Sequence, residues 1–267
     1  VAELWLRRLP GRIRPGEGRM RGYGAFAWYY DELTENVSYE KRAEYFLKLV
    51  EKFGSSGPIV LDLACGTGSL SMELARRGCD VIGVDISEDM LSVARGKALE
   101  HPEWDILYLC QPMTDLDLFG TVDTTICALD SINHLTDPIQ VQQAFQKVSL
   151  FTAPGGLFLF DVNTPYKHRE ILGNSCYVYE FDDLFCAWQN FFEEETCSVT
   201  VQLDFFSEEN GHYVREQEYI TERAYTREEL SQWLKQAGFD LLAVYGEDSM
   251  KPPAPDCQRW IFAARKK

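Results

Sequence analysis

An apolar strand pattern followed at once by a glycine-rich turn and a helical stretch constrains the fold of this chain most. Residues 59–63 form a short, largely apolar run, which is typical of a buried parallel strand. Gly66 and Gly68 follow, and a helical pattern then continues through Arg77. Glycine lets the backbone approach a ligand where a Cβ atom would collide with it. Strand, glycine turn and helix in this order predict a nucleotide-binding crevice in a doubly wound α/β sheet.

A second strand pattern indicates which nucleotide the crevice binds. Residues 81–84 are apolar and end in Asp85, at the distance from Gly66 where a carboxylate accepts hydrogen bonds from ribose hydroxyls. A dinucleotide-binding turn needs a third glycine, and this chain has Ser71 there. Asp62, just before the turn, would repel a pyrophosphate and attract a cationic amino-acid group. The loop therefore favours S-adenosylmethionine (SAM) over NAD, with the ribose on Asp85 and the ammonium near Asp62.

The rest of the chain repeats strands and helices until about residue 165 and then changes character. Residues 166–221 contain four strand-like segments, and Glu209-Asn210-Gly211 is a hairpin signal. We predict an α/β fold, a seven-stranded doubly wound (Rossmann-like) sheet built from 20–165 and 222–267, with 166–221 as an antiparallel β insertion. The strands of the sheet are expected at 59–63, 81–84, 106–110, 122–129, 157–162, 239–245 and 260–264, with a turn at 154–156.

Composition and charge limit the function classes. A chain of 267 residues with 45% hydrophobic content can bury the core of one large α/β domain. A net charge of −16 disfavours nucleic acid as a partner, because the surface repels phosphates. Eight cysteines without a Cys-x-x-Cys pair indicate reduced thiols in a cytoplasmic protein and no metal site. No apolar stretch approaches the roughly 20 residues of a membrane span.

The first 19 residues differ from the rest in charge. Residues 1–19 carry five arginines and two glutamates, an arginine-rich and acid-poor pattern that is also found in transit peptides. Met20 is a natural start, so we interpret 1–19 as a non-native extension or a poorly ordered leader.

Residues 62–68, Asp-Leu-Ala-Cys-Gly-Thr-Gly, resemble the first motif of class I SAM-dependent methyltransferases. The β insertion is similar to that of glycine N-methyltransferase-like and sugar N-methyltransferase-like enzymes, where it forms a platform or lid beside a small-molecule substrate. The resemblance covers about residues 23–264. It implies a set of cofactor contacts, namely Tyr30, Arg42, Asp62, Ala64, Cys65, Gly66, Gly68, Asp85, Ile86, Met90, Gln111, Met113, Leu129, Asp130 and His134.

The segment that follows the fourth strand carries the candidate catalytic residues. Residues 129–135 resemble the Asn-Ser-x-x-His-Leu stretch of glycine N-methyltransferase-like enzymes. By that resemblance, Leu129 and Asp130 lie along the methionine part of the cofactor, and His134 lies near the transfer site. Asp130 and His134 are therefore the candidate catalytic residues, with His134 able to act as a base near neutral pH. The alternative role of His134 is to order this loop by hydrogen bonding.

One site of the family pattern is altered in this chain. Pro112 stands where the family has an acidic residue that meets the adenine amino group. Gln111 and the backbone of Met113 are the candidate replacements, with the Met113 side chain against the purine.

Other candidates flank the core. Arg42 could pair with the methionyl carboxylate of the cofactor. Candidate substrate contacts are Tyr23 before the core and three residues after the fifth strand. Among these, Arg169 suits a carboxylate, and the other two are Asn163 and Tyr166.

The chain is therefore interpreted as a SAM-dependent methyltransferase that acts on nitrogen or oxygen of a small-molecule acceptor. Alternatives are an RNA or protein methyltransferase, a non-catalytic SAM-binding protein and an NAD-dependent oxidoreductase. The net charge argues against an RNA substrate. No Asn-Pro-Pro-Tyr or Asp-Pro-Pro-Tyr motif follows the fourth strand, which argues against methylation of base amines or of glutamine. The exposed edge of the insertion could pair with a second copy and form a homodimer.

Overall fold

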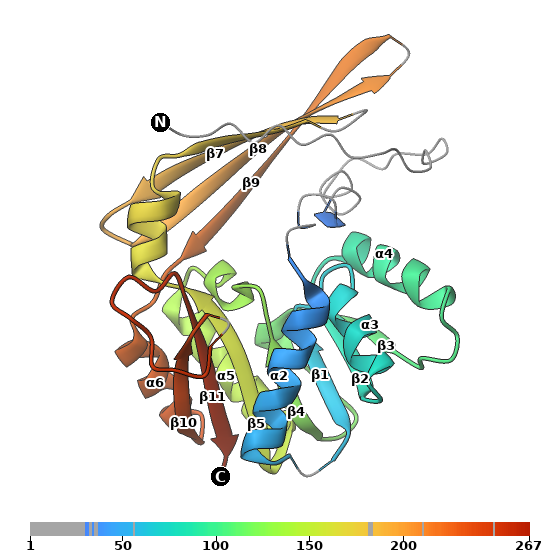
Figure 1. The fold of residues 1–267 in the computed structure, drawn as a ribbon, viewed down its shortest axis with the longest axis vertical. Helices are drawn as coiled ribbons and strands as arrows, with labels where there is room; N and C mark the ends of the chain where they lie inside the picture. Colours follow the sequence, from blue (N-terminus) through green and yellow to red (C-terminus); the bar gives the residue numbers. More distant parts are fainter. Residues whose placement is uncertain are drawn as a thin grey trace.

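The computed structural model describes residues 30–31, 34, 37–55, 57–180, 184–209, 211–247 and 249–267. A seven-stranded sheet forms the centre of the fold, and a four-stranded sheet lies beyond one end of it (Figure 1). The strands of the larger sheet are β1 (Ile59–Leu63), β2 (Asp80–Asp85), β3 (Leu107–Cys110), β4 (Val122–Cys127), β5 (Thr152–Asn163), β10 (Phe239–Gly246) and β11 (Arg259–Lys266).

The strand order of the larger sheet is β10-β11-β5-β4-β1-β2-β3. Strand β11 runs antiparallel to both of its neighbours, whereas the pairs from β5 to β3 are parallel. From β1, the strands β2 and β3 are added on one side, whereas β4 and β5 are added on the other side. The strand order therefore reverses between β1 and β4, and open α/β sheets bind ligands at such a position. The predicted seven-stranded doubly wound sheet with an antiparallel insertion is confirmed.

The α-helices in the described part of the chain are α2 (Tyr39–Phe53), α3 (Ser69–Arg76), α4 (Glu88–Leu99), α5 (Pro138–Phe151) and α6 (Arg227–Gln236). All of these except α3, which follows Gly68, begin at a residue whose side chain accepts a hydrogen bond from a free backbone N–H group. Ser87 accepts a hydrogen bond at the start of α4, and Asp137 does so before the proline of α5. Thr226 and Glu229 form a reciprocal capping box at the start of α6.

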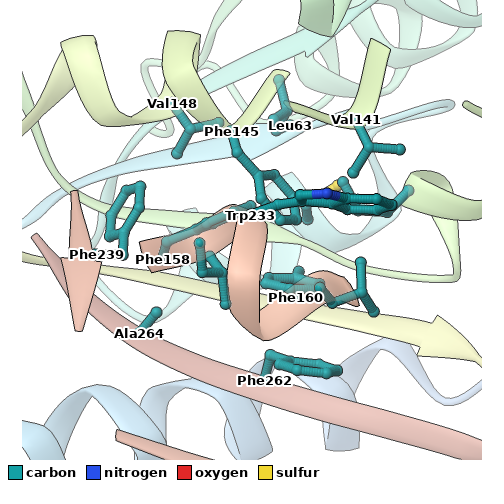
Figure 2. Close-up of a cluster of buried hydrophobic side chains, with 14 of the residues drawn as sticks. Leu63, Val141, Phe145, Val148, Phe158, Phe160, Trp233, Phe239, Phe262 and Ala264 are labelled. Atoms are coloured by element: carbon teal, nitrogen blue, oxygen red, sulfur yellow. The ribbon is translucent and has the colours of Figure 1, made fainter. Parts of the chain in front are cut away.

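Helices cover both faces of the larger sheet. On one face, α5 and α6 pack against alternate residues of the strands, and Figure 2 shows Phe145 and Trp233 of these helices beside Phe158, Phe160 and Phe262. On the other face, α2 and α3 pack against the intervening strand residues. The side chains of a parallel strand are buried on both sides in this arrangement, which accounts for the continuous apolar runs of the sequence.

The insertion consists of one helical turn and an antiparallel sheet. Its strands are β6 (Cys176–Glu180), β7 (Leu184–Glu193), β8 (Ser198–Glu209) and β9 (His212–Arg223), paired in chain order. The β8–β9 hairpin projects away from the core, and β9 then returns toward α6 (Figure 1). Before β6, Lys167–Leu172 forms a turn of π-helix, which the sequence analysis did not predict. Pairing of an edge strand with a second copy stays a prediction.

Two local expectations are corrected by the structure. The expected turn at 154–156 is a bulge within β5, because Val122 pairs with Thr152 whereas Thr124 pairs with Leu157. The expected fourth strand through Leu129 ends at Cys127, since Leu129 has a left-handed backbone that no strand residue adopts. Residues 1–19 lie outside the described part of the chain. None of the described helices has the length and apolar character needed to cross a membrane.

Candidate active site

A small hollow that opens to solvent lies at the carboxyl ends of β1 and β4, where the strand order reverses across the sheet. The turn after β1, the segment after β4, and two tyrosines at and before the start of α2 contribute to its lining. The lining residues are Tyr30, Tyr39, Asp62, Ala64, Cys65, Gly66, Leu70, Ala128, Leu129 and Ser131.

The two glycines of the turn have different structural roles. Both adopt left-handed backbones, with φ of 54° at Gly66 and 74° at Gly68. A Cβ atom on Gly68 would lie 2.5 Å from the Tyr108 hydroxyl and 2.9 Å from the Ala94 side chain, so this glycine is required by packing. A Cβ atom on Gly66 would meet nothing within 4 Å. The backbone at Gly66 therefore faces open space in the hollow, as a ligand-cradling turn does.

Two carboxylates flank this turn. Asp85 accepts hydrogen bonds from the backbone N–H groups of Gly66 and Ser87, each at 2.8 Å. Burial raises the pKa of Asp85, and these hydrogen bonds oppose the rise. Asp62 is 2% exposed and accepts a hydrogen bond from the Ser71 hydroxyl at 2.5 Å. Burial raises the pKa of Asp62 to about 7 despite this hydrogen bond, and the charge of Asp85 adds to the rise.

A buried ion network holds the segment after β4. Asp161, near the end of β5, is fully buried and accepts hydrogen bonds from the N–H groups of Leu129 at 3.1 Å and Asp130 at 2.8 Å. Both of these residues have left-handed backbones, with φ of 58° and 52°, and such strain persists only where the surroundings fix it. Arg259 pairs with Asp161 and, at 2.6 Å, with Asp130, while Arg42 lies 3.3 Å from Asp161. The network thus fixes one wall of the hollow.

A second polar cluster lies where β9 of the insertion meets the core. One ligand atom each from Asp130, His134 and Glu222 lie within 4.8 Å of one another. Glu222 is held by Asn163, whose amide donates to it at 3.0 Å, and by His168, whose Nε2 is 3.5 Å away. Burial raises the pKa of Glu222, but the hydrogen bond from His168 and the charges of His134 and His168 outweigh burial and lower it to about 2. Glu222 is therefore a carboxylate at neutral pH.

Tyr30 and Asp31 lie beside the glycine turn. Thr67 of the turn donates a hydrogen bond to Asp31 at 2.7 Å, and Lys97 of α4 pairs with the same carboxylate. Tyr30 and Tyr39 line the hollow next to this contact, and burial raises the pKa of both. Two tyrosine rings with neutral hydroxyls therefore form part of the lining of the hollow.

Comparisons with known proteins agree with this geometry. The methyltransferase domain family matches residues 60–156, from β1 into β5. A protein of Geobacillus sp. (strain WCH70) that carries the name methyltransferase is 32% identical over 246 residues, which span 91% of this chain and 99% of that protein. The crystal structure of a SAM-dependent methyltransferase from Clostridium acetobutylicum has 31% identity and a TM-score of 0.81, over 91% of this chain and 98% of that one. This chain belongs to the SAM-dependent methyltransferase family.

The methyltransferase is an enzyme that uses SAM as its cofactor. A sugar N-methyltransferase from Streptoalloteichus has a TM-score of 0.74 over 97% of this chain and 98% of its own. Its identity is 18%, so the similarity is one of fold alone. Residues of this chain fit the cofactor, because an open glycine cradle lies between a carboxylate suited to a ribose and one suited to an ammonium.

The structure brings most of the predicted cofactor residues to one place. Those that line the hollow directly are Tyr30, Asp62, Ala64, Cys65, Gly66 and Leu129. Gly68, Asp85 and Asp130 support the same walls, and His134 lies in the adjoining cluster. Their contacts with the cofactor stay predictions.

The predicted adenine contacts lie farther along the sheet edge. Ile86 is 71% exposed after β2, whereas Met90 is buried in α4. Gln111 exchanges two hydrogen bonds with the backbone of Asp117 and so orders the loop after β3. Met113 packs against the hydrophobic core.

The predicted charged contacts have protein partners in the structure. Arg42 pairs with Asp161 and lies 3.9 Å from Glu247, so its guanidinium is already held by carboxylates. Arg169 pairs with Glu194 at 2.6 Å on the exposed surface. Asn163 belongs to the cluster around Glu222, and Tyr166 precedes the π-helical turn. Tyr23 lies outside the described residues.

Several residues of the site were missed by the sequence analysis. Asp161 could have been identified from the sequence, because it is a carboxylate within an apolar strand pattern, as are Asp62 and Asp85. Glu222 and Arg259 lie in segments with many polar residues, and no local pattern distinguishes them from solvent-facing side chains.

Proposed function

We propose that this methyltransferase transfers the methyl group of SAM to a nitrogen or oxygen atom of a small molecule bound between the core and the insertion. One observation carries the proposal. The segment that lines the hollow at Leu129 and Ser131 also carries Asp130 and His134, and Glu222 of β9 joins them in one polar cluster. A polar cluster of this kind next to a cofactor site suits a small acceptor better than a nucleic-acid groove.

Three residues in and beside the turn would each contact a different part of the cofactor. Asp85 would accept hydrogen bonds from the ribose hydroxyls, Asp62 would face the ammonium, and the backbone at Gly66 would lie against the ligand. SAM supplies a methyl group that is already activated by its positive sulfur. The protein then mainly has to orient the acceptor, exclude water and move a proton. Ile86, Met90, Gln111 and Met113 would surround the adenine.

His134 is the proposed base for the acceptor. Its ring is exposed on η2 (Ser131–His134), and Asp130 and Glu222 lie within 4.8 Å. Both carboxylates can accept a hydrogen bond from the ring and so orient it. Asp130 is fixed by Arg259, so its proposed role is to orient His134. Residues 166–221 would act as a lid over the acceptor.

The acceptor class is tested by supplying SAM with a radiolabelled methyl group to three fractions of a cell extract: small molecules, RNA and proteins. Label in the small-molecule fraction alone is the expected result, and label in RNA or protein would contradict the proposal. The His134→Ala variant should lose most of the transfer rate, and His134→Gln should not restore it, because glutamine cannot act as a base. Restoration of the rate by His134→Gln would instead indicate that His134 only orders the loop.

A further inference from the structure

The side chain of Asn133 joins three segments that lie far apart in the sequence. It is fully buried, although it directly precedes the exposed His134 in η2. Its amide nitrogen donates hydrogen bonds to the carbonyl oxygens of Asn163 at 3.2 Å and Arg223 at 2.9 Å. Its amide oxygen accepts a hydrogen bond from the N–H group of Asn163 at 2.9 Å. Asn133 therefore ties the turn after β4 to the ends of β5 and β9.

Two side chains at the end of β9 and just after it hold the backbone that follows His134. The guanidinium of Arg223 donates a hydrogen bond to the carbonyl oxygen of Thr136 at 3.2 Å. The hydroxyl of Tyr225 donates one to the carbonyl oxygen of Leu135. Tyr225 is 1% exposed and belongs to the main hydrophobic core, so its hydroxyl is well fixed. Residues 223–225 thus hold the chain on both sides of His134.

This support decides where the His134 ring lies, because the turn itself is weak. The turn η2 has four residues with 3₁₀ hydrogen bonds, whose geometry is poorer than that of an α-helix. The ring of His134 is exposed, so its place depends mainly on its own backbone. Glu222, which clusters with this ring, directly precedes Arg223 in the chain. A shift of Arg223 relative to the turn would therefore change the spacing between the ring and Glu222.

We propose that Asn133, Arg223 and Tyr225 are positioning residues for methyl transfer, because they hold the His134 ring beside Glu222. This inference rests on the proposed function, in which His134 is the base that acts on the acceptor. The described residues that line the hollow do not include these three. Their replacement should therefore slow the transfer and leave cofactor binding intact. A displacement of about 1 Å at a reacting group can cost about a hundredfold in rate.

The Asn133→Asp variant tests the largest of these contacts. It keeps the shape of the side chain and replaces the amide donor with an oxygen that faces two carbonyl oxygens. Transfer of labelled methyl groups from SAM to the small-molecule fraction should fall about tenfold or more. Affinity for S-adenosylhomocysteine, measured by calorimetry, should stay within about twofold of that of the unaltered protein. Tyr225→Phe removes only a hydroxyl, so it should slow the transfer less than Asn133→Asp does.

Thr152→Val is the control for a loss of buried hydrogen bonding. Thr152 is 2% exposed and donates to the carbonyl oxygen of Val148 at 2.7 Å. It is the first residue of β5, at the opposite end of that strand from Asn163. Its replacement should leave the transfer rate unchanged.

The combination of Asn133→Asp with His134→Gln distinguishes positioning from a merely structural role. A residue that acts through the His134 ring costs nothing further once the imidazole is gone. The double variant should therefore transfer methyl groups at the rate of His134→Gln alone, whereas independent effects would multiply. Multiplied losses would overturn the inference.

The remaining outcomes are equally defined. A full rate in Asn133→Asp, with His134→Gln impaired, overturns the inference and leaves the proposed function in place. A full rate in His134→Gln overturns the proposed base and the inference with it. A loss of S-adenosylhomocysteine affinity as large as the loss of rate would show that Asn133 shapes the cofactor site instead. If Asn133→Asp does not unfold cooperatively in urea, Tyr225→Phe takes its place in the same combination, and a full rate in that variant overturns the inference.

Discussion

Asp62 should make the protein less stable above neutral pH than below it. Its carboxyl group is fully buried, and its pKa is raised from an ordinary 3.8 to about 7. The folded state therefore holds this proton more tightly than the unfolded state does. The stability that the proton provides is complete below about pH 4 and is lost as the pH rises to about 7. At 1.36 kcal/mol for each pKa unit, the difference between a pKa of 3.8 in the unfolded state and about 7 in the folded state corresponds to about 4 kcal/mol in the free energy of unfolding.

The Asp62→Asn variant removes this titration and keeps an oxygen that can accept the Ser71 hydrogen bond. Urea unfolding at several values of pH from 4 to 8 should show the variant gaining stability relative to the unaltered protein as the pH rises, by up to about 4 kcal/mol. Asp80→Asn, at an exposed residue of the neighbouring strand, should show no such gain. A stability difference for Asp62→Asn that does not change with pH would refute the reasoning.

The same group links pH to cofactor binding. An ammonium beside Asp62 favours the ionised carboxylate, so SAM binding should release a proton and strengthen as the pH rises toward 7. Calorimetry in buffers with different ionisation enthalpies measures that proton directly. Asp62→Asn should bind SAM more weakly than the unaltered protein, and its affinity should not vary with pH in this way. Equal affinity of the two proteins at pH 8 would show that Asp62 does not contact the ammonium.

Three further predictions concern the walls of the hollow. Arg259→Met removes the cation that Asp130 and Asp161 share and leaves Asp161 with Arg42 alone. Urea unfolding should therefore show a loss of about 3–5 kcal/mol, and a loss below about 1 kcal/mol would contradict the role of the network. Gly68→Ala should lower the melting temperature more than Gly66→Ala, because only a Cβ atom at residue 68 meets Tyr108. Gly66→Ala should instead impair SAM binding. The opposite order of melting temperatures would contradict the packing argument. Asp85→Ala should weaken SAM binding by about 1–3 kcal/mol in calorimetry, and unchanged affinity would contradict the ribose assignment.

The parts of the site that depend on local sequence could be predicted. Gly66 and Gly68 come shortly after β1, and Asp85 is the last residue of β2, so their positions at the carboxyl ends of the strands are set within a few residues of the chain. The hairpin signal at 209–211 likewise fits the pairing of Glu209 with His212.

Features that depend on distant partners were not predictable. Arg259 and Asp161 are 98 residues apart in the chain, and only the antiparallel pairing of β11 with β5 brings them together. Glu222 reaches the core because β9 returns from the hairpin toward α6 (Figure 1), which brings Glu222 to Asn163 at the carboxyl end of β5. The bulge at 154–156 also depends on a distant partner. Gly156 lies so close to β4 that a Cβ atom on it would be 2.7 Å from the carbonyl oxygen of Asp123.

The central claim is that the hollow after β1 and β4 binds SAM through a glycine cradle between two carboxylates. Isothermal titration of the purified protein with SAM, S-adenosylhomocysteine and NAD tests it most directly. Micromolar binding of the first two, with no detectable binding of NAD, is the predicted result. Binding of NAD, or the absence of SAM binding, would contradict the assignment of this hollow as the cofactor site.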